Sequence, residues 1–419
     1  MRDRDAWRQL SRRIQLVAKK VPILPTLSWD REVKQRFLRA QGRELPRADY
    51  PDRRAEFAAA EALAREAAEL HRDGDSVDAW VEATLLSYAD GARMLQAVGT
   101  PEFGRLSSEV YGLAAQPVRD EPGARTHLDL ARALLSDDPP CRELAPPLPA
   151  DAAEVGAREA AREIQRRLRE EFPRERVSVT LSRGLAAKAI AGNRRIRIRR
   201  DARFTPREVE LLVVHEGLIH MATTINGLRQ PFLRCLGRAS PRALRLQEGL
   251  AVFAEFMGGV LDLERMRRLA ERVVGIDIAQ RGGDFLDVHR FFLERGQSLE
   301  EAYESARRVF RGGCPRGGSA FSKDLVYLQG LFELQRHLQE LMARGGGAAA
   351  QAQLELLFVG KLALDDLGAL AAARRAAALV RPEHLPDWAR PARLAARLAD
   401  GGPLETRAAP ARARSLRVG

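Results

Sequence analysis

The sequence predicts a predominantly α-helical fold that contains a small β-sheet. Apolar residues recur every three or four positions in residues 54–72 and 84–98, which indicates amphipathic helices. Residues 177–181 and 195–199 contain β-branched side chains and alternate between apolar and polar residues, as is typical of strands. Capping residues followed by proline, at Thr205 and Ser240, then indicate two helix starts. The expected order is a helical region, two strands, and helices to the end.

The elements divide the chain into five predicted parts. Residues 1–137 form an N-terminal helical region, and residues 138–151, which contain five prolines, form a linker. A central region follows, whose order is helix, strand, strand, helix, helix. The five expected parts are 1–137, 138–151, the central core 152–344, C-terminal helices 345–402 and a disordered tail 403–419.

Helix signals continue through the central region. The expected helix at 152–172 ends at Pro173, and the helix that begins after Ser240 ends at Gly258 and Gly259. Residues 299–310 and 322–343 also have helical periodicity, and the glycine-rich stretch from 345 interrupts it.

Composition excludes several classes of protein. The chain has 419 residues, of which 45% are hydrophobic, and no apolar run approaches the length of a membrane-spanning helix. The N-terminus lacks the apolar core of a secretory signal, so we expect a cytoplasmic protein with no membrane partner. The three cysteines are far apart, which argues against a disulfide framework or a thiolate metal site.

The net charge of +12 raises the question of nucleic-acid binding. Only six of the 69 basic residues are lysine, however, and such an arginine bias is typical of GC-rich bacterial coding. The arginines are scattered, and no recognition motif accompanies them. We therefore expect no specific nucleic-acid partner.

The motif that carries chemistry is 215-HEGLIH-220, on the helix that begins after Thr205. Metalloproteases commonly place two histidines four residues apart, with a glutamate after the first. His215 and His220 are five apart and would diverge by about 140° on a regular helix. One alternative is therefore that both are core histidines.

A π-bulge would remove the objection, because it places residues five apart on one face, and such bulges are enriched at functional sites. Gly217 would ease the distortion. Glu248, in 247-QEGLA-251 on the next helix, could supply a third ligand. Its apolar neighbours indicate that it is at least partly buried, and a buried carboxylate needs a partner.

The combination of HExxxH and QEGLA resembles the bacterial QEGLA-motif proteins, also labelled flavohaemoglobin expression-modulating. That family is similar to the microtubule-associated tyrosine carboxypeptidases. Residues 94–112, 226–231 and 321–330 also resemble segments of the family. The resemblance implies a gluzincin-like metallopeptidase core at 152–344, with extra N- and C-terminal helices.

The resemblance implies one Zn²⁺ per chain, held by His215, His220 and Glu248. It implies that Glu216 is the catalytic carboxylate of a zinc metallocarboxypeptidase, which removes the C-terminal residue of a peptide or protein. A zinc-activated water would attack the scissile bond, with Glu216 as general base. The alternative is a non-catalytic regulator of gene expression on the same fold.

Candidates for substrate contact are less specific. Tyr327 is the candidate oxyanion donor, although a core tyrosine explains it equally well. Lys323 lies one turn before Tyr327 and is a candidate for binding the substrate carboxylate. Arg311 and Arg316, which flank a glycine-rich loop, are further candidates for the carboxylate, and Asn226 is a candidate lining residue.

The strand 195-RIRIR-199 is the last substrate candidate. It precedes the histidine helix, so we expect it to be an edge strand that pairs with the substrate backbone. Its arginine face would favour an acidic peptide.

Overall fold

Helices form most of the computed structural model, which describes residues 4–69, 76–118, 123–141, 144–149, 152–183, 185, 188–344, 348–399 and 401–404. This confirms the expected fold class. None of the described helices is both long and apolar enough to cross a membrane.

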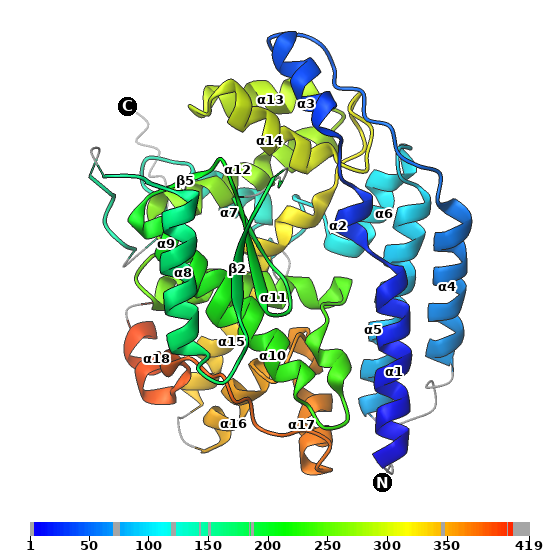
Figure 1. The fold of residues 1–419 in the computed structure, drawn as a ribbon, viewed down its shortest axis with the longest axis vertical. Coiled ribbons are helices and arrows are strands. Elements are labelled where there is room, and N and C mark those ends of the chain that lie inside the picture. Colours follow the sequence, from blue (N-terminus) through cyan, green and yellow to red (C-terminus); the bar gives the residue numbers. More distant parts are fainter. Residues whose placement is uncertain are drawn as a thin grey trace, which may run out of the picture.

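Among the N-terminal helices, α1, α4 and α5 lie side by side along one side of the molecule (Figure 1). Their apolar stripes face inward, as the sequence periodicity predicts. This region consists of α1 (Arg4–Lys20), α2 (Ile23–Thr26), α3 (Arg31–Arg39), α4 (Arg54–Glu69), α5 (Ser76–Gln96), α6 (Glu102–Tyr111) and α7 (His127–Leu134).

A three-stranded sheet lies beside helix α8 (Ala157–Glu171), which packs against β2 and β4 (Figure 1). Its order is β2–β4–β3, with β2 (Ser178–Ser182) parallel and β3 (Ala189–Ala191) antiparallel to β4 (Arg195–Arg199). Because β4 is paired on both sides, the expectation that 195–199 is an edge strand is wrong. The edge near the histidine helix is β3. A separate pair joins β1 (Val155–Gly156) and β5 (Arg203–Phe204).

The central helices follow the sheet. Thr205 caps α9 (Pro206–Leu212) with the predicted capping box, and α9 runs without a break into the π-helix η1 (Val213–Met221) and α10 (Ala222–Leu228). Ser240 caps a short 3₁₀ turn that leads into α11 (Leu244–Met257). The remaining central elements are η2 (Arg234–Gly237), η3 (Pro241–Ala243), α12 (Leu263–Gln280), α13 (Phe285–Glu294), α14 (Leu299–Phe310), η4 (Ser322–Leu325) and α15 (Val326–Ala343).

Helices α11 and α15 cross at two glycines. A Cβ on Gly249 would lie 2.2 Å from the carbonyl carbon of Gly330, and one on Gly330 would lie 1.9 Å from the Arg245 carbonyl oxygen. The backbones therefore touch, and only glycine fits at either position. This crossing sets Glu248, beside Gly249, against the first turns of α15.

The C-terminal helices close the far end of the bundle (Figure 1). They are α16 (Ala348–Leu357), η5 (Leu364–Asp366), α17 (Leu367–Arg375), η6 (Asp387–Ala389) and α18 (Pro391–Leu398). Leu404 is fully buried and exchanges two hydrogen bonds with the Gln335 side chain. The division into five parts stays a prediction, and most of the expected tail, residues 405–419, lies outside the described residues.

Candidate metal centre

The histidine motif lies on a π-helix, so His215 and His220 share one face of η1. Their ring centroids are 4.8 Å apart. Gly217 has a role that the sequence did not reveal: a Cβ there would lie 2.6 Å from the Leu168 side chain, so glycine lets α8 pack against the π-helix. The widened helix answers the geometric objection to the five-residue spacing.

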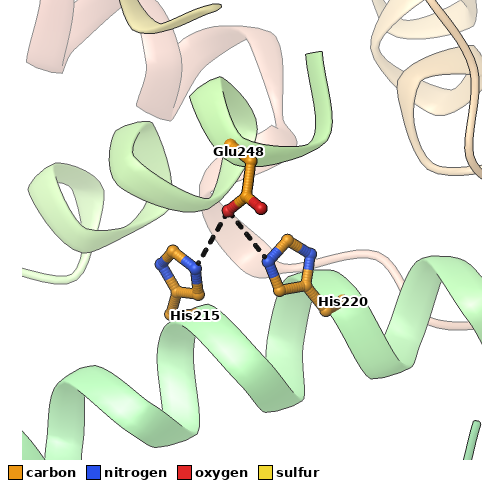
Figure 2. Close-up of side chains that lie close together, drawn as sticks. All are labelled: His215, His220 and Glu248. Carbon is orange, nitrogen blue, oxygen red and sulfur yellow. Dashed lines mark ion pairs between the residues drawn. The ribbon is translucent and has the colours of Figure 1, made fainter. Parts of the chain in front are cut away.

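Glu248 reaches from α11 into the space between the two imidazoles (Figure 2). Its Oε2 lies 3.6 Å from His215 Nε2 and 3.5 Å from His220 Nε2. One ligand atom from each of these residues lies within 4.8 Å of the others. Oε2 is buried and has no hydrogen-bond partner, which is costly unless another group satisfies it. Two imidazoles and one carboxylate in this arrangement fit a tetrahedral zinc site with one open position.

A hydrogen-bond chain behind His215 orients its ring. His215 Nδ1 lies 2.7 Å from Oε1 of Glu255, which is fully buried on α11. Burial raises the pKa of Glu255, but Arg265 and His215 outweigh burial and lower it to about 2, so Glu255 accepts and Nδ1 donates. Arg265 holds both oxygens of Glu255, at 3.1 and 3.2 Å. Nδ1 of His215 is therefore occupied, and Nε2 is the nitrogen that faces Glu248 and is left for a metal.

Lys323 holds the other oxygen of Glu248. Its Nζ donates to Glu248 Oε1 at 2.9 Å and to the Tyr327 hydroxyl at 3.3 Å. Burial raises the pKa of Glu248, but Lys323 and the two histidines hold it well below its usual range. Lys323 therefore keeps Glu248 ionised and leaves only Oε2 facing the histidines.

The QEGLA glutamine ties α11 to the histidine helix. Thr223 Oγ1 donates to the Ile219 carbonyl at 2.7 Å and lies 3.0 Å from the side-chain amide of Gln247. This contact and the glycine crossing fix the position of Glu248 from both sides.

Glu216 points toward the edge strand of the sheet. Its Oε2 accepts a hydrogen bond from the backbone N–H of Ala191 at 3.0 Å. The side chain is partly exposed, and it lies next to His215 in the π-helix. A carboxylate is thus anchored by β3 beside the candidate metal ligands.

The other predicted contact residues have varied positions. Asn226 is buried, and among the described residues its side chain bonds only to backbone groups of Phe358, Glu383 and His384. It is therefore positioned as a structural residue. Arg316 is exposed, whereas Arg311 packs over the Phe321 ring at 5.2 Å.

Sequence reasoning missed three residues near the site. Glu255 and Arg265 form the chain behind His215. Lys361 follows α16, and burial lowers its pKa, while the carboxylates of Glu248 and Glu216 counteract burial. Its rarity as one of six lysines is the only sequence signal for it.

Comparisons with known proteins give one family and one solved structure. The model of a family described as microtubule-associated tyrosine carboxypeptidase matches residues 35–400. Among solved structures, the chain is similar to Trypanosoma cruzi metallocarboxypeptidase 1, with 13% sequence identity and a TM-score of 0.37; the match covers 82% of this chain and 88% of that one. No protein with a curated description matches the chain.

Proposed function

The chain belongs to the microtubule-associated tyrosine carboxypeptidase family, and on this premise we propose that it is a zinc-dependent carboxypeptidase. His215, His220 and Glu248 would hold the metal, and Glu216 would be the general base. The observation that carries the proposal is the buried, unpartnered Oε2 of Glu248 between two histidine nitrogens, with Glu216 adjacent in the chain.

Each polar side chain has a distinct proposed role. Zinc, when bound, would polarise the scissile carbonyl and lower the pKa of a water. Glu216 would accept the proton of that water and pass it to the leaving amine. The hydrogen bond from Ala191 restrains Glu216 without neutralising it, which suits a base that must accept and release a proton.

Tyr327 is the proposed donor to the oxyanion. Lys323 Nζ donates to its hydroxyl oxygen, so the hydroxyl proton is free to point elsewhere. Lys323 itself is occupied by Glu248 and Tyr327, and we propose a positioning role for it in place of substrate-carboxylate binding.

We propose that β3, in place of 195–199, pairs with the substrate backbone. Arg199 N bonds to Lys188 O and Gly192 N bonds to Arg195 O, so the polar groups of Ala189 and Ala191 point away from β4. The N–H of Ala191 donates to Glu216, and the polar groups of Ala189 and the Ala191 carbonyl remain on this edge, where an extended peptide could add as a further strand.

The substrate would be the C-terminus of a peptide or protein. Arg195 and Arg197 are exposed on β4 while Ile196 and Ile198 are buried, so the sheet presents a cationic face. This face favours an acidic peptide upstream of the cleaved residue. The family description makes tyrosine the first terminal residue to test.

The test begins with metal content. Elemental mass spectrometry of the purified full chain should find about one zinc per chain, and His220→Ala and Glu248→Ala should lose it. Among peptides that differ in their last residue, those that are substrates should lose that residue alone. Glu216→Gln should bind zinc and should cleave none of these peptides.

Two outcomes would contradict the proposal. A wild-type chain without metal, even after reconstitution, would leave HEGLIH as a pair of core histidines. Zinc bound without cleavage of any peptide would favour the non-catalytic regulatory alternative.

A further inference from the structure

The buried groups behind Glu248 and Tyr327 carry more positive than negative charge. Three cations pair with three carboxylates at hydrogen-bond distance: Arg265 with Glu255, Arg308 with Asp324, and Lys323 with Glu248. Two further arginines, Arg272 on α12 and Arg311 after α14, have no hydrogen bond to any carboxylate within the described parts of the chain.

Arg272 lies beside the proposed oxyanion donor. Its guanidinium lies over the Tyr327 ring, with Cζ 5.5 Å from the ring centroid. Its Nε is 3.9 Å from Asp324 Oδ2, too far for a hydrogen bond, and Arg308 occupies both oxygens of that carboxylate. The side chain is 24% exposed, so it is not fully enclosed in the core.

Arg311 is held in a similar manner. Its guanidinium lies over the Phe321 ring at 5.2 Å, and its Nε is buried without a hydrogen-bond partner. Stacking on an aromatic ring fixes the plane of a guanidinium and leaves its N–H edges available. Burial and then the charge of Arg308 lower the pKa of Arg272 and of Arg311 to about 10, and the Asp324 carboxylate, which Arg308 already holds, only partly counteracts this.

The ring contact places Arg272 near the reacting groups, and Arg311 interacts electrostatically with Arg308, Asp324 and Tyr327 of the same cluster. Tyr327 is 3.3 Å from Lys323 Nζ, which is 2.9 Å from Glu248. Arg272 thus stacks on Tyr327, and Lys323 links Tyr327 to the proposed metal ligand Glu248.

We propose that Arg272 and Arg311 bind the free α-carboxylate of the substrate's last residue. The proposal rests on the proposed carboxypeptidase function, because an enzyme that removes a C-terminal residue must distinguish a free carboxylate from an internal amide. Two guanidinium groups suit a carboxylate, since their N–H edges form charge-assisted hydrogen bonds to both oxygens. A small free anion such as chloride has the same charge and is the alternative source of the ligand.

The experiment measures binding without turnover. The zinc-loaded Glu216→Gln chain is titrated against an N-terminally fluorescein-labelled peptide ending in tyrosine, with either a free carboxylate or a carboxamide, and anisotropy gives each Kd. We expect the acid to bind at least about tenfold tighter than the amide. Arg272→Gln and Arg311→Gln should each weaken acid binding about tenfold to a hundredfold and change amide binding less than about twofold.

Two controls separate this role from a structural one. Arg268→Gln, one turn earlier on α12 and paired with Glu264 on the surface, should change neither Kd. Arg272→Lys keeps the positive charge but lacks the paired N–H donors of the guanidinium, so it should retain part of the preference for the acid. If Arg272→Gln loses zinc or melts early, Arg272→Lys and Arg311→Gln decide the question.

Several results would overturn the proposal. Equal losses of acid and amide binding would show that the arginines only support the fold. Loss of acid preference in Lys361→Met but in neither arginine variant would assign the subsite to Lys361 and not to the arginines. If the acid and the amide bind with equal Kd, and chloride lowers the Kd of the amide in the wild type but not in Arg272→Gln, the arginines form a site for a free anion. If the wild-type chain neither cleaves nor binds either peptide, the proposed function is refuted as well. If it cleaves the peptide, but its preference for the acid over the amide does not depend on the arginines, only this inference is refuted.

Discussion

Replacing Glu255 by glutamine tests how much the hydrogen bond behind His215 contributes to metal affinity. The change keeps the side-chain size and removes the charge that accepts from His215 Nδ1 at 2.7 Å. Without that charge, the His215 ring no longer favours the tautomer that carries its proton on Nδ1 and leaves Nε2 free. Partners of this kind commonly contribute 10- to 100-fold in metal affinity, so we expect the zinc Kd to rise by about 10- to 100-fold, or about 1.4–2.7 kcal/mol.

The same substitution should destabilise the metal-free fold. Arg265 is 13% exposed at its side chain and would lose its carboxylate partner. Breaking a buried ion pair by removing one member typically costs about 3–5 kcal/mol. The double variant Glu255→Gln/Arg265→Met removes both charges and should recover part of that stability, but not the zinc affinity.

The assay is competition with a chromophoric chelator for zinc affinity, beside urea unfolding of the metal-free proteins. Unchanged zinc affinity in Glu255→Gln would refute the reasoning. Recovered affinity in the double variant would also refute it, because it would show that the loss came from instability and not from the orientation of His215.

Three further outcomes are expected. Gly330→Ala should lower the free energy of unfolding in urea by about 3 kcal/mol or more, because the new Cβ meets backbone, whereas Gly368→Ala, with nothing within 4 Å, should raise it by up to about 1 kcal/mol. Ala191→Pro, which removes the N–H donor to Glu216, should lower kcat about tenfold to a hundredfold at unchanged zinc content, and Ala191→Val should not. Burial and then Arg245 lower the pKa of His127 to about 4, so the unfolded chain binds a proton between pH 6.5 and 4 that the folded chain does not; stability should fall by about 3 kcal/mol over that range, and less in His127→Leu.

Local signals predicted the elements that carry the site. The capping box at Thr205, the cap at Ser240 and the helix at 299–310 follow from side chains within one turn of the backbone they satisfy, so sequence alone reveals them. The five-residue histidine spacing indicated a π-helix by geometry, and the structure confirms it.

Contacts between distant segments could not be predicted in this way. The edge position of β3 depends on which strands pair, and a three-residue strand of alanine and isoleucine has no distinctive pattern. Glu255 and Arg272 resemble ordinary helical residues in sequence, and only the packing of α11, α12 and α15 reveals their partners. Asn226 lies close to the motif in sequence, but its hydrogen bonds go to a segment more than 130 residues later.

Those bonds from Asn226 have a consequence for biosynthesis. The Asn226 side chain bonds to the backbone of Phe358 and of His384, 132 and 158 residues further along the chain. A nascent chain that ends before His384 leaves this buried amide partly unsatisfied at the end of the histidine helix, which costs about 1–3 kcal/mol per group. At about 5–20 residues per second, the ribosome needs roughly 8–30 s to supply these partners. A site built in this way reaches its final geometry only after residue 384 has been synthesised.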